Sequence, residues 1–329
     1  MAAVRRSSLV VATSIRDLAA SVRSLLPDVD VNVIQLDKTG LVPASSLCQV
    51  SGVVLCDPKV VVQLIGQIDL PLKWVQSTWA GVESIMSAVQ ESKKQPTFTF
   101  TRTGEGYGQV IGEYVIGHVI AHERKFKQMF KTNESRIWDA NYKYIRSLST
   151  LTIGVLGLGQ IGTEITRMCK AMGMTVWGLA TGQRKSDHPY VDEFRCTNDL
   201  CDLLSKCDYI CNILPSTPLT RNLLSGDVLA ICAKRKSVLI NVGRGDIIDE
   251  DSLINAVNQG WIGGAILDVF AKEPLPESSR LWTLPNVTVS PHVSGPSQPS
   301  QVAEGFVNNY RLFCEGSPLK FQVDWKKGY

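Results

Sequence analysis

The sequence lacks the features that mark several special classes of protein. No apolar run approaches the roughly 18 to 20 residues needed to cross a bilayer. Charges of one sign do not cluster, and Lys and Arg total 34 against 31 Asp and Glu, a net charge of +3. These absences exclude a membrane-spanning protein and give little electrostatic attraction to nucleic acid or to a membrane surface.

Cysteine pairs of the metal-binding or redox type are also missing. The nine cysteines are an odd number with no CxxC spacing and no zinc-like Cys/His grouping. We therefore expect free thiols, no metal site and a reducing, cytoplasmic location. Arg5 and Arg6 stand in an acid-free start that leaves a transit peptide open, but we favour a short tail before a first strand.

The composition is that of an ordinary folded protein. Hydrophobic residues make up 44% and charged residues 20% of 329 residues, enough for a little over two domains of about 150 residues each. Short apolar runs alternate with helical patterns, and their continuous hydrophobicity predicts parallel α/β sheets covered on both faces. The expected strands are 8–13, 31–36, 52–57, 72–78, 151–157, 175–180, 209–214, 237–242, 265–270 and 287–291.

Two long helices are predicted outside this alternation. Apolar residues at helical spacing predict one over 109–130, which would join the two domains, and another over 301–315. The stretch 132–150 has little periodicity and is expected to be an irregular connection.

A glycine loop follows the strand expected at 151–157. Its sequence is GLGQIG, and a helical pattern comes next. Gly157 permits a tight turn, Gly159 lets the backbone approach a pyrophosphate, and Gly162 allows close packing of helix on strand. This context predicts dinucleotide binding by Gly157, Gly159, Gln160, Ile161 and Gly162.

The expected NAD-specific acid is absent. An Asp or Glu about 20 residues after the glycines accepts hydrogen bonds from the ribose of NAD, but Ala180 stands there, 18 residues after Gly162. Thr181, Arg184 and Lys185 follow, and cationic side chains suit a 2′-phosphate. We favour NADP over NAD, with two solvated surface cations as the alternative.

Only four histidines are available as a proton donor near neutral pH. His118 and His122 lie on the predicted linking helix, where packing or surface roles are expected, and His188 lies in a polar loop and is expected to be solvated. His292 follows a predicted strand and precedes a turn-rich segment, which is where α/β sheets usually bind ligands.

Seven motifs in order make the chain resemble the D-isomer-specific 2-hydroxyacid dehydrogenase family. They are 79–83 (WAGVE), 112–115 (GEYV), 157–162 (GLGQIG), 214–220 (LPSTPLT), 241–245 (NVGRG), 267–270 with 273–274 (LDVF, EP) and 290–292 (SPH). The resemblance implies that Arg244 binds the substrate carboxylate, that His292 is the general acid/base, and that Glu273 orients the imidazole. Taken singly, Arg244 in a salt bridge and Glu273 as a surface acid are the alternatives.

Further roles follow from the same resemblance. Asp268 would accept from the nicotinamide carboxamide, and the backbone around Gly81 would donate to the substrate carboxylate. Trp79 and Trp138 would wall the substrate pocket, Trp138 from a partner subunit, with core packing as the alternative. The full cofactor set adds Leu214, Pro215, Val242, Gly243, Arg244, His292, Ser294 and Gly295, and the substrate set is Ala80, Gly81, Val82, Arg244 and His292.

The implied architecture is α/β, with a Rossmann-type doubly wound domain (103–293) inserted into a smaller flavodoxin-like domain (1–102 and 294–329). The expected activity is hydride transfer between NADP(H) and a small D-2-hydroxy acid or 2-keto acid, as in glyoxylate or hydroxypyruvate reductase, in a homodimer. An NAD(P)-sensing corepressor on the same fold is the alternative, since the family includes such proteins.

Overall fold

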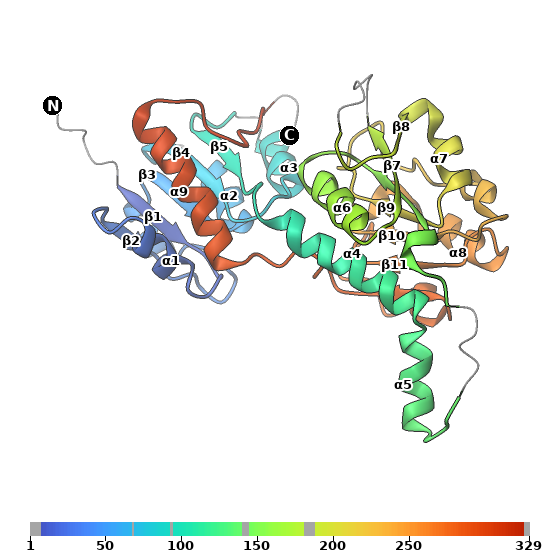
Figure 1. Cartoon of the computed structure of the whole chain (residues 1–329). Helices are drawn as coiled ribbons and strands as arrows, with labels where there is room; N and C mark the ends of the chain where they lie inside the picture. Colours follow the sequence, from blue (N-terminus) through green and yellow to red (C-terminus); the bar gives the residue numbers. More distant parts are fainter. Residues whose placement is uncertain (1–7, 68, 93–94, 140–144, 181–187, 326–329) are drawn as a thin grey trace. The chain divides into compact units, whose positions relative to one another are not determined.

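A computed structural model describes residues 8–67, 69–92, 95–139, 145–180 and 188–325. The chain divides into two compact units (Figure 1): unit 1 is Met1–Gly106 with Ser297–Tyr329, and unit 2 is Tyr107–Pro296. The boundaries expected from the sequence, after residues 102 and 293, lie a few residues earlier. No helix of the described residues is long and apolar enough to cross a membrane.

Unit 1 is built on a five-stranded parallel sheet with the order β2-β1-β3-β4-β5, the flavodoxin-like order. Its strands are β1 (Leu9–Ala12), β2 (Val31–Val33), β3 (Gly52–Cys56), β4 (Leu72–Ser77) and β5 (Thr99–Arg102). One face packs against α1 (Leu18–Leu25) and α9 (Pro299–Glu315), and the other against α2 (Pro58–Ile65) and α3 (Glu83–Ser92). Burial on both faces explains the uninterrupted apolar runs of β1 and β3.

Unit 2 is built on a seven-stranded parallel sheet with the order β12-β11-β10-β9-β6-β7-β8. Its first six strands in the chain have the Rossmann order, and β12 extends one edge. The predicted fold class is confirmed. The strands are β6 (Thr152–Leu156), β7 (Thr175–Ala180), β8 (Glu193–Cys196), β9 (Tyr209–Asn212), β10 (Val238–Asn241), β11 (Gly264–Leu267) and β12 (Val287–Val289).

The second sheet is flanked by α4 (Tyr107–Glu123), α6 (Gln160–Ala171), α7 (Leu200–Lys206) and α8 (Glu250–Asn258), and α5 (Phe126–Glu134) follows α4. Helix α4 lies beside α6 (Figure 1), and two small residues allow the close approach, since a Cβ at Gly112 would stand 2.3 Å from the Met168 sulfur and one at Gly108 would stand 2.8 Å from Glu164 Cβ. Helices α7 and α8 pack with the apolar core of the sheet.

Three secondary-structure predictions are corrected. The sequence does not predict strands β5 and β8; each has only four residues and is the outermost strand on one side of its sheet. The single helix predicted over 109–130 is two helices, α4 and α5, because Lys125 between them adopts a left-handed conformation with φ 58°. Neither glycine nor proline marks that break in the sequence.

Candidate active site

The glycine loop lies where the strand order of unit 2 reverses, between β6 and β9, the position at which such sheets bind dinucleotides. Gly157 turns with φ +110°, and a Cβ at Gly162 would stand 1.8 Å from the Gly157 carbonyl oxygen. A Cβ at Gly159 would meet nothing within 4 Å. Open space at Gly159 beside the N-terminus of α6, which begins at Gln160, suits a pyrophosphate.

Two buried asparagines tie together the loops after β9 and β10. Asn212 and Asn241 are paired in register, and the Asn212 amide donates to Asn241 Oδ1 at 2.8 Å. Asn212 Oδ1 accepts from Leu214 N at 3.1 Å, and Asn241 Nδ2 donates to the Arg244 carbonyl at 3.0 Å. Asn212 lies outside the motifs quoted from the sequence, and Asn241, although part of NVGRG, is assigned no role there. Each ends an apolar strand with an amide.

Arg244 lies half-buried on the loop after β10, where its Nη1 donates to the Gly243 carbonyl at 2.7 Å. The next residue brings this loop against the loop after β11, since a Cβ at Gly245 would stand 1.9 Å from the Phe270 carbonyl carbon. The fold therefore places the Arg244 loop beside the segment that leads to Glu273.

Glu273 and His292 contact each other directly. His292 Nδ1 lies 2.8 Å from Glu273 Oε2, and Glu273 Oε1 accepts from Phe270 N at 2.9 Å. The His292 side chain remains 51% exposed, so its ring can be reached from solvent. Its backbone is left-handed, with φ 54°.

Asp268 directly follows β11 and is fully buried. Its carboxylate accepts hydrogen bonds from Ser290 Oγ at 2.6 Å, Val293 N at 2.9 Å and Ser294 N at 2.8 Å. It thus holds the loop that carries His292, a contact that sequence reasoning did not foresee.

The remaining predicted cofactor residues of unit 2 occupy the same edge of the sheet where they are described. Leu214 borders Gly157 and Gly243, and Gly295 borders Ile111 and Tyr107 of α4. Thr181, Arg184 and Lys185 lie outside the described residues, directly after β7. Gln160 and Ile161 begin α6, Val242 is buried after β10, and Pro215 follows Leu214.

The predicted substrate loop 80–82 belongs to unit 1. It follows β4, and its entrance is fixed because Thr78 Oγ1 donates to the buried Asp57 carboxylate at 2.8 Å. Thr103 N donates to the Trp79 carbonyl at 3.2 Å. Val82 is buried, whereas Ala80 and Gly81 are half-buried.

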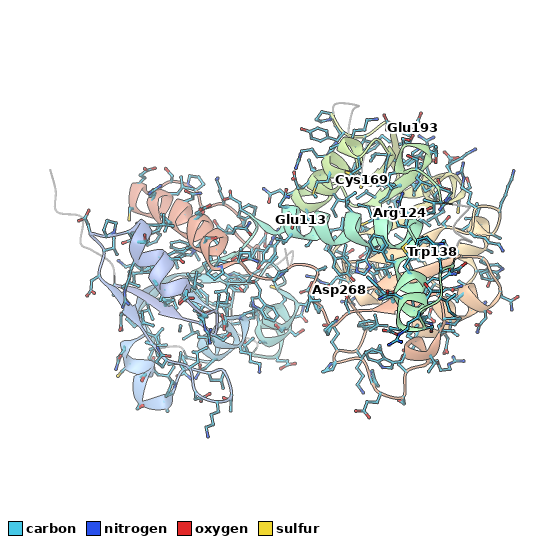
Figure 2. All side chains as sticks on the ribbon, turned by 60° about the horizontal axis from the view of Figure 1, so that its bottom comes forward. Glu113, Arg124, Trp138, Cys169, Glu193 and Asp268 are labelled. Atoms are coloured by element: carbon cyan, nitrogen blue, oxygen red, sulfur yellow. The ribbon has the colours of Figure 1, made fainter. Side chains whose placement is uncertain are left out.

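Other side chains differ in their surroundings from what the sequence suggested. Trp79 and Trp138 are 54% and 97% exposed, so neither is a core residue (Figure 2 labels Trp138). His188, expected to be solvated, is half-buried, with Nε2 2.9 Å from Thr163 Oγ1. Within the described ranges no group of three His, Cys, Asp or Glu side chains could hold a metal ion.

A Rossmann sheet with a glycine loop, an arginine and a His–Glu pair at its carboxyl edge defines a dinucleotide-dependent oxidoreductase. The model of the D-isomer specific 2-hydroxyacid dehydrogenase family, NAD binding domain, matches residues 116–294, more than half of the chain. The protein belongs to this family and is an NAD(P)-dependent D-2-hydroxyacid dehydrogenase family enzyme.

Solved structures from bacteria match nearly the whole chain. A D-isomer specific 2-hydroxyacid dehydrogenase family protein from Aeromonas salmonicida is 29% identical, with TM-score 0.83, over 97% of this chain and 99% of its own. A relative from Xanthobacter autotrophicus, in complex with NADPH and MES, is 28% identical with TM-score 0.83 over 98% and 100%. An NADPH-dependent glyoxylate/hydroxypyruvate reductase from Sinorhizobium meliloti is 26% identical with TM-score 0.81 over 98% and 100%.

Proposed function

We propose that this enzyme uses NADPH to reduce a small 2-keto acid of the glyoxylate or hydroxypyruvate type. The observation that carries the proposal is the 2.8 Å contact between His292 and Glu273 beside the Arg244 loop. The Sinorhizobium relative, described as an NADPH-dependent glyoxylate/hydroxypyruvate reductase, supports the choice of substrate class.

Each proposed catalytic side chain suits one part of this reaction. The bound cofactor supplies a hydride to the carbonyl carbon. Arg244 presents a fixed, always charged fork that binds the substrate carboxylate and polarises the carbonyl oxygen. Protonated His292 donates from Nδ1 to Glu273 and from Nε2 to the developing alkoxide, and the carboxylate stabilises the imidazolium before transfer.

Preference for NADP is proposed from the end of β7. The strand ends at Ala180, so no carboxylate stands there to accept from the ribose of NAD or to repel a 2′-phosphate. Arg184 and Lys185 are the proposed partners of that phosphate, and Thr181 completes the group. The other cofactor residues predicted from the sequence, with Asp268 at the nicotinamide, belong to the same proposal.

The carboxylate of the substrate is proposed to receive further donors from the backbone of unit 1. Gly81 and Val82 follow the exposed Trp79 and precede α3, and Ala80 completes the turn. Successive backbone N–H groups at such a turn can bind an anionic carboxylate because their partial positive charges point toward the same site.

A homodimer is proposed from apolar side chains around α5. Phe130, Ile137 and Trp138 are 65%, 60% and 97% exposed, which is unusual for such large residues in one short segment. Beside them α4 and α5 border a cavity of about 400 Å³ that could receive a partner segment. A cytoplasmic location is proposed because all nine cysteines are free thiols.

The decisive experiment is a panel of 2-keto acids assayed with NADPH and with NADH. Glyoxylate or hydroxypyruvate with NADPH should give the highest kcat/KM. Equal or better efficiency with NADH would refute the cofactor preference, and a bulkier keto acid as the best substrate would refute the substrate class. Absence of turnover with every pair would refute the reductase and favour a cofactor-sensing role. Sedimentation of the same preparation tests the dimer.

A further inference from the structure

A chain of hydrogen-bonded side chains connects helix α4 to the segment that carries His292. Tyr114 Oη lies 2.6 Å from Ser290 Oγ, and Ser290 Oγ donates to Asp268 Oδ1 at 2.6 Å. Tyr114 lies on α4, Ser290 directly follows β12, and Asp268 directly follows β11. Asp268, labelled in Figure 2, is the buried end of the chain.

The direction of both hydrogen bonds is determined by the carboxylate. Asp268 also accepts from two backbone N–H groups, so both of its carboxylate oxygens serve as acceptors. Ser290 must then donate its single hydroxyl proton to Asp268, which leaves Tyr114 as the donor to Ser290. Burial raises the pKa of Tyr114, which keeps its hydroxyl protonated and able to donate.

Asp268 holds the His292 backbone from both sides. Its main-chain carbonyl accepts from His292 N at 2.9 Å, and its carboxylate accepts from Val293 N and Ser294 N. These bonds enclose the left-handed backbone of His292, a conformation that non-glycine residues adopt at a cost unless their surroundings enforce it. The Ser290 hydroxyl and the two backbone N–H groups together orient the Asp268 carboxylate.

We propose that Ser290 and Tyr114 are positioning residues for His292 that act through Asp268. Ser290 occupies Oδ1 together with Val293 N, and Tyr114 fixes the rotamer of the Ser290 hydroxyl. Without the two hydroxyls the carboxylate loses a donor and rotates, and the backbone at 292–294 relaxes, which moves the imidazole away from its catalytic position. This proposal rests on the proposed role of His292 as the general acid.

The test compares Ser290→Ala, Ser290→Thr and Tyr114→Phe with a matched control, Ser237→Ala. Ser237 is a buried serine whose hydroxyl donates to the Cys207 carbonyl at 2.7 Å just before β10, at the opposite edge of the same sheet. Each variant is assayed for kcat and KM with the best keto acid and reduced cofactor, for cofactor Kd, and for amide hydrogen exchange of residues 288–296.

Ser290→Ala should lower kcat, measured at saturating cofactor, roughly tenfold, with KM for the keto acid within about twofold of the parent, because the alignment of His292 rather than substrate binding is lost. The amides of Val293 and Ser294 should exchange faster. Ser290→Thr retains a hydroxyl and should restore most of the rate. Tyr114→Phe should have a smaller effect, of about threefold. Ser237→Ala should leave kcat and the exchange of 288–296 unchanged.

The double variant Tyr114→Phe/Ser290→Ala separates a connected chain from two independent contacts. If Tyr114 acts only through Ser290, the double variant has the same kcat as Ser290→Ala alone. If instead the two losses in kcat multiply, the residues act independently and the proposed connection is overturned. Parent-like kcat and hydrogen exchange in Ser290→Ala overturn the positioning role, as does failure of Ser290→Thr to restore the rate. His292→Ala tells the two proposals apart. If it keeps the normal kcat, the proposed function fails. If His292→Ala loses most of its kcat while Ser290→Ala is normal, the positioning proposal fails and the proposed function stands.

Discussion

The carboxyl ends and the amino ends of the parallel strands in unit 2, called here the carboxyl edge and the amino edge of the sheet, differ in how their polar residues are used. At the carboxyl edge, the backbone of Gly157 and His292 is left-handed, and His292 presents a half-exposed ring. At the amino edge, Glu123, Arg146 and Asp208 are joined in one network of ion pairs. Glu123 is 2% exposed, and its carboxylate accepts hydrogen bonds from Arg146 Nε at 3.0 Å and from Tyr209 Oη at 2.6 Å.

The amino-edge network also holds the start of β6. Arg146 Nη1 donates to Asp208 Oδ1 at 3.1 Å, and Asp208 Oδ2 accepts from Thr152 N at 2.9 Å. Burial acts to raise the pKa of Glu123, but hydrogen bonds from His122, Arg146 and Tyr209 outweigh it and hold that pKa well below its ordinary value. Internal pairing stabilises the fold at this edge, whereas the carboxyl edge keeps strained backbone and accessible groups where a ligand is proposed.

The test with the largest expected effect replaces one histidine at each edge by alanine. His292→Ala should lower kcat roughly 10²-fold or more, because a general acid is lost. His122→Ala removes a ring whose Nδ1 lies 2.7 Å from Tyr209 Oη and should lower Tm with kcat within about twofold. Steady-state kinetics and thermal melts measure both. A comparable loss of kcat in both variants would remove the functional distinction between the edges.

The second largest effect is expected for cofactor binding when the glycine loop is changed. Gly162→Ala places a Cβ 1.8 Å from the Gly157 carbonyl, so the loop must move. We expect cofactor affinity to fall by about 10-fold to 100-fold, since the shift misdirects the backbone of the predicted phosphate site. Fluorescence titration with NADPH measures the loss, and unchanged affinity would show that the cofactor does not depend on this turn.

A change at the amino edge should affect stability alone. Glu123→Gln removes the charge that pairs with Arg146, and we expect the free energy of unfolding at pH 7 to fall by about 2 kcal/mol, with kcat unchanged. Arg146 is 44% exposed, which keeps the loss below that of a fully buried pair.

The same variant tests the pH dependence. Because the folded-state pKa of Glu123 is lowered from 4.5, its contribution is complete above that pH and is lost as the pH falls toward the folded-state value. Urea unfolding at pH 7, 5, 4 and 3 should therefore show the parent and Glu123→Gln converging in acid. A constant difference between them would contradict the ionic origin of the stabilisation.

The smallest expected effect separates close packing from helix propensity. Gly117 lies within α4, and a Cβ there would meet nothing within 4 Å. Gly117→Ala should raise the free energy of unfolding by about 0.5 to 1 kcal/mol, because alanine loses less backbone freedom on folding. Thermal melts measure the change, and a decrease would show that a neighbour occupies this surface of the helix in solution.

Local pattern predicted most of the fold because a strand buried on both faces leaves an uninterrupted apolar run. It missed β5 and β8, whose four-residue segments carry polar and charged side chains, and the break at Lys125, whose left-handed backbone no glycine announces. The glycine loop was recognisable because the three glycines that it requires, at 157, 159 and 162, lie within one short segment. Asn212, Asn241 and Ser290 receive no role from the sequence, although the last two lie in quoted motifs, because their partners lie on neighbouring strands or loops.

The sequence by itself therefore determined two α/β units, a dinucleotide loop and three candidate catalytic residues at 244, 273 and 292. Only the tertiary structure decided that the Arg244 loop lies against Phe270 and that Asp268 holds the His292 backbone. It also brings Glu273 into the contact with His292 that the family resemblance implies. The reason is the parallel sheet of unit 2, whose carboxyl ends gather loops that are far apart in the chain along one edge. Spacing in the sequence records none of those cross-strand contacts.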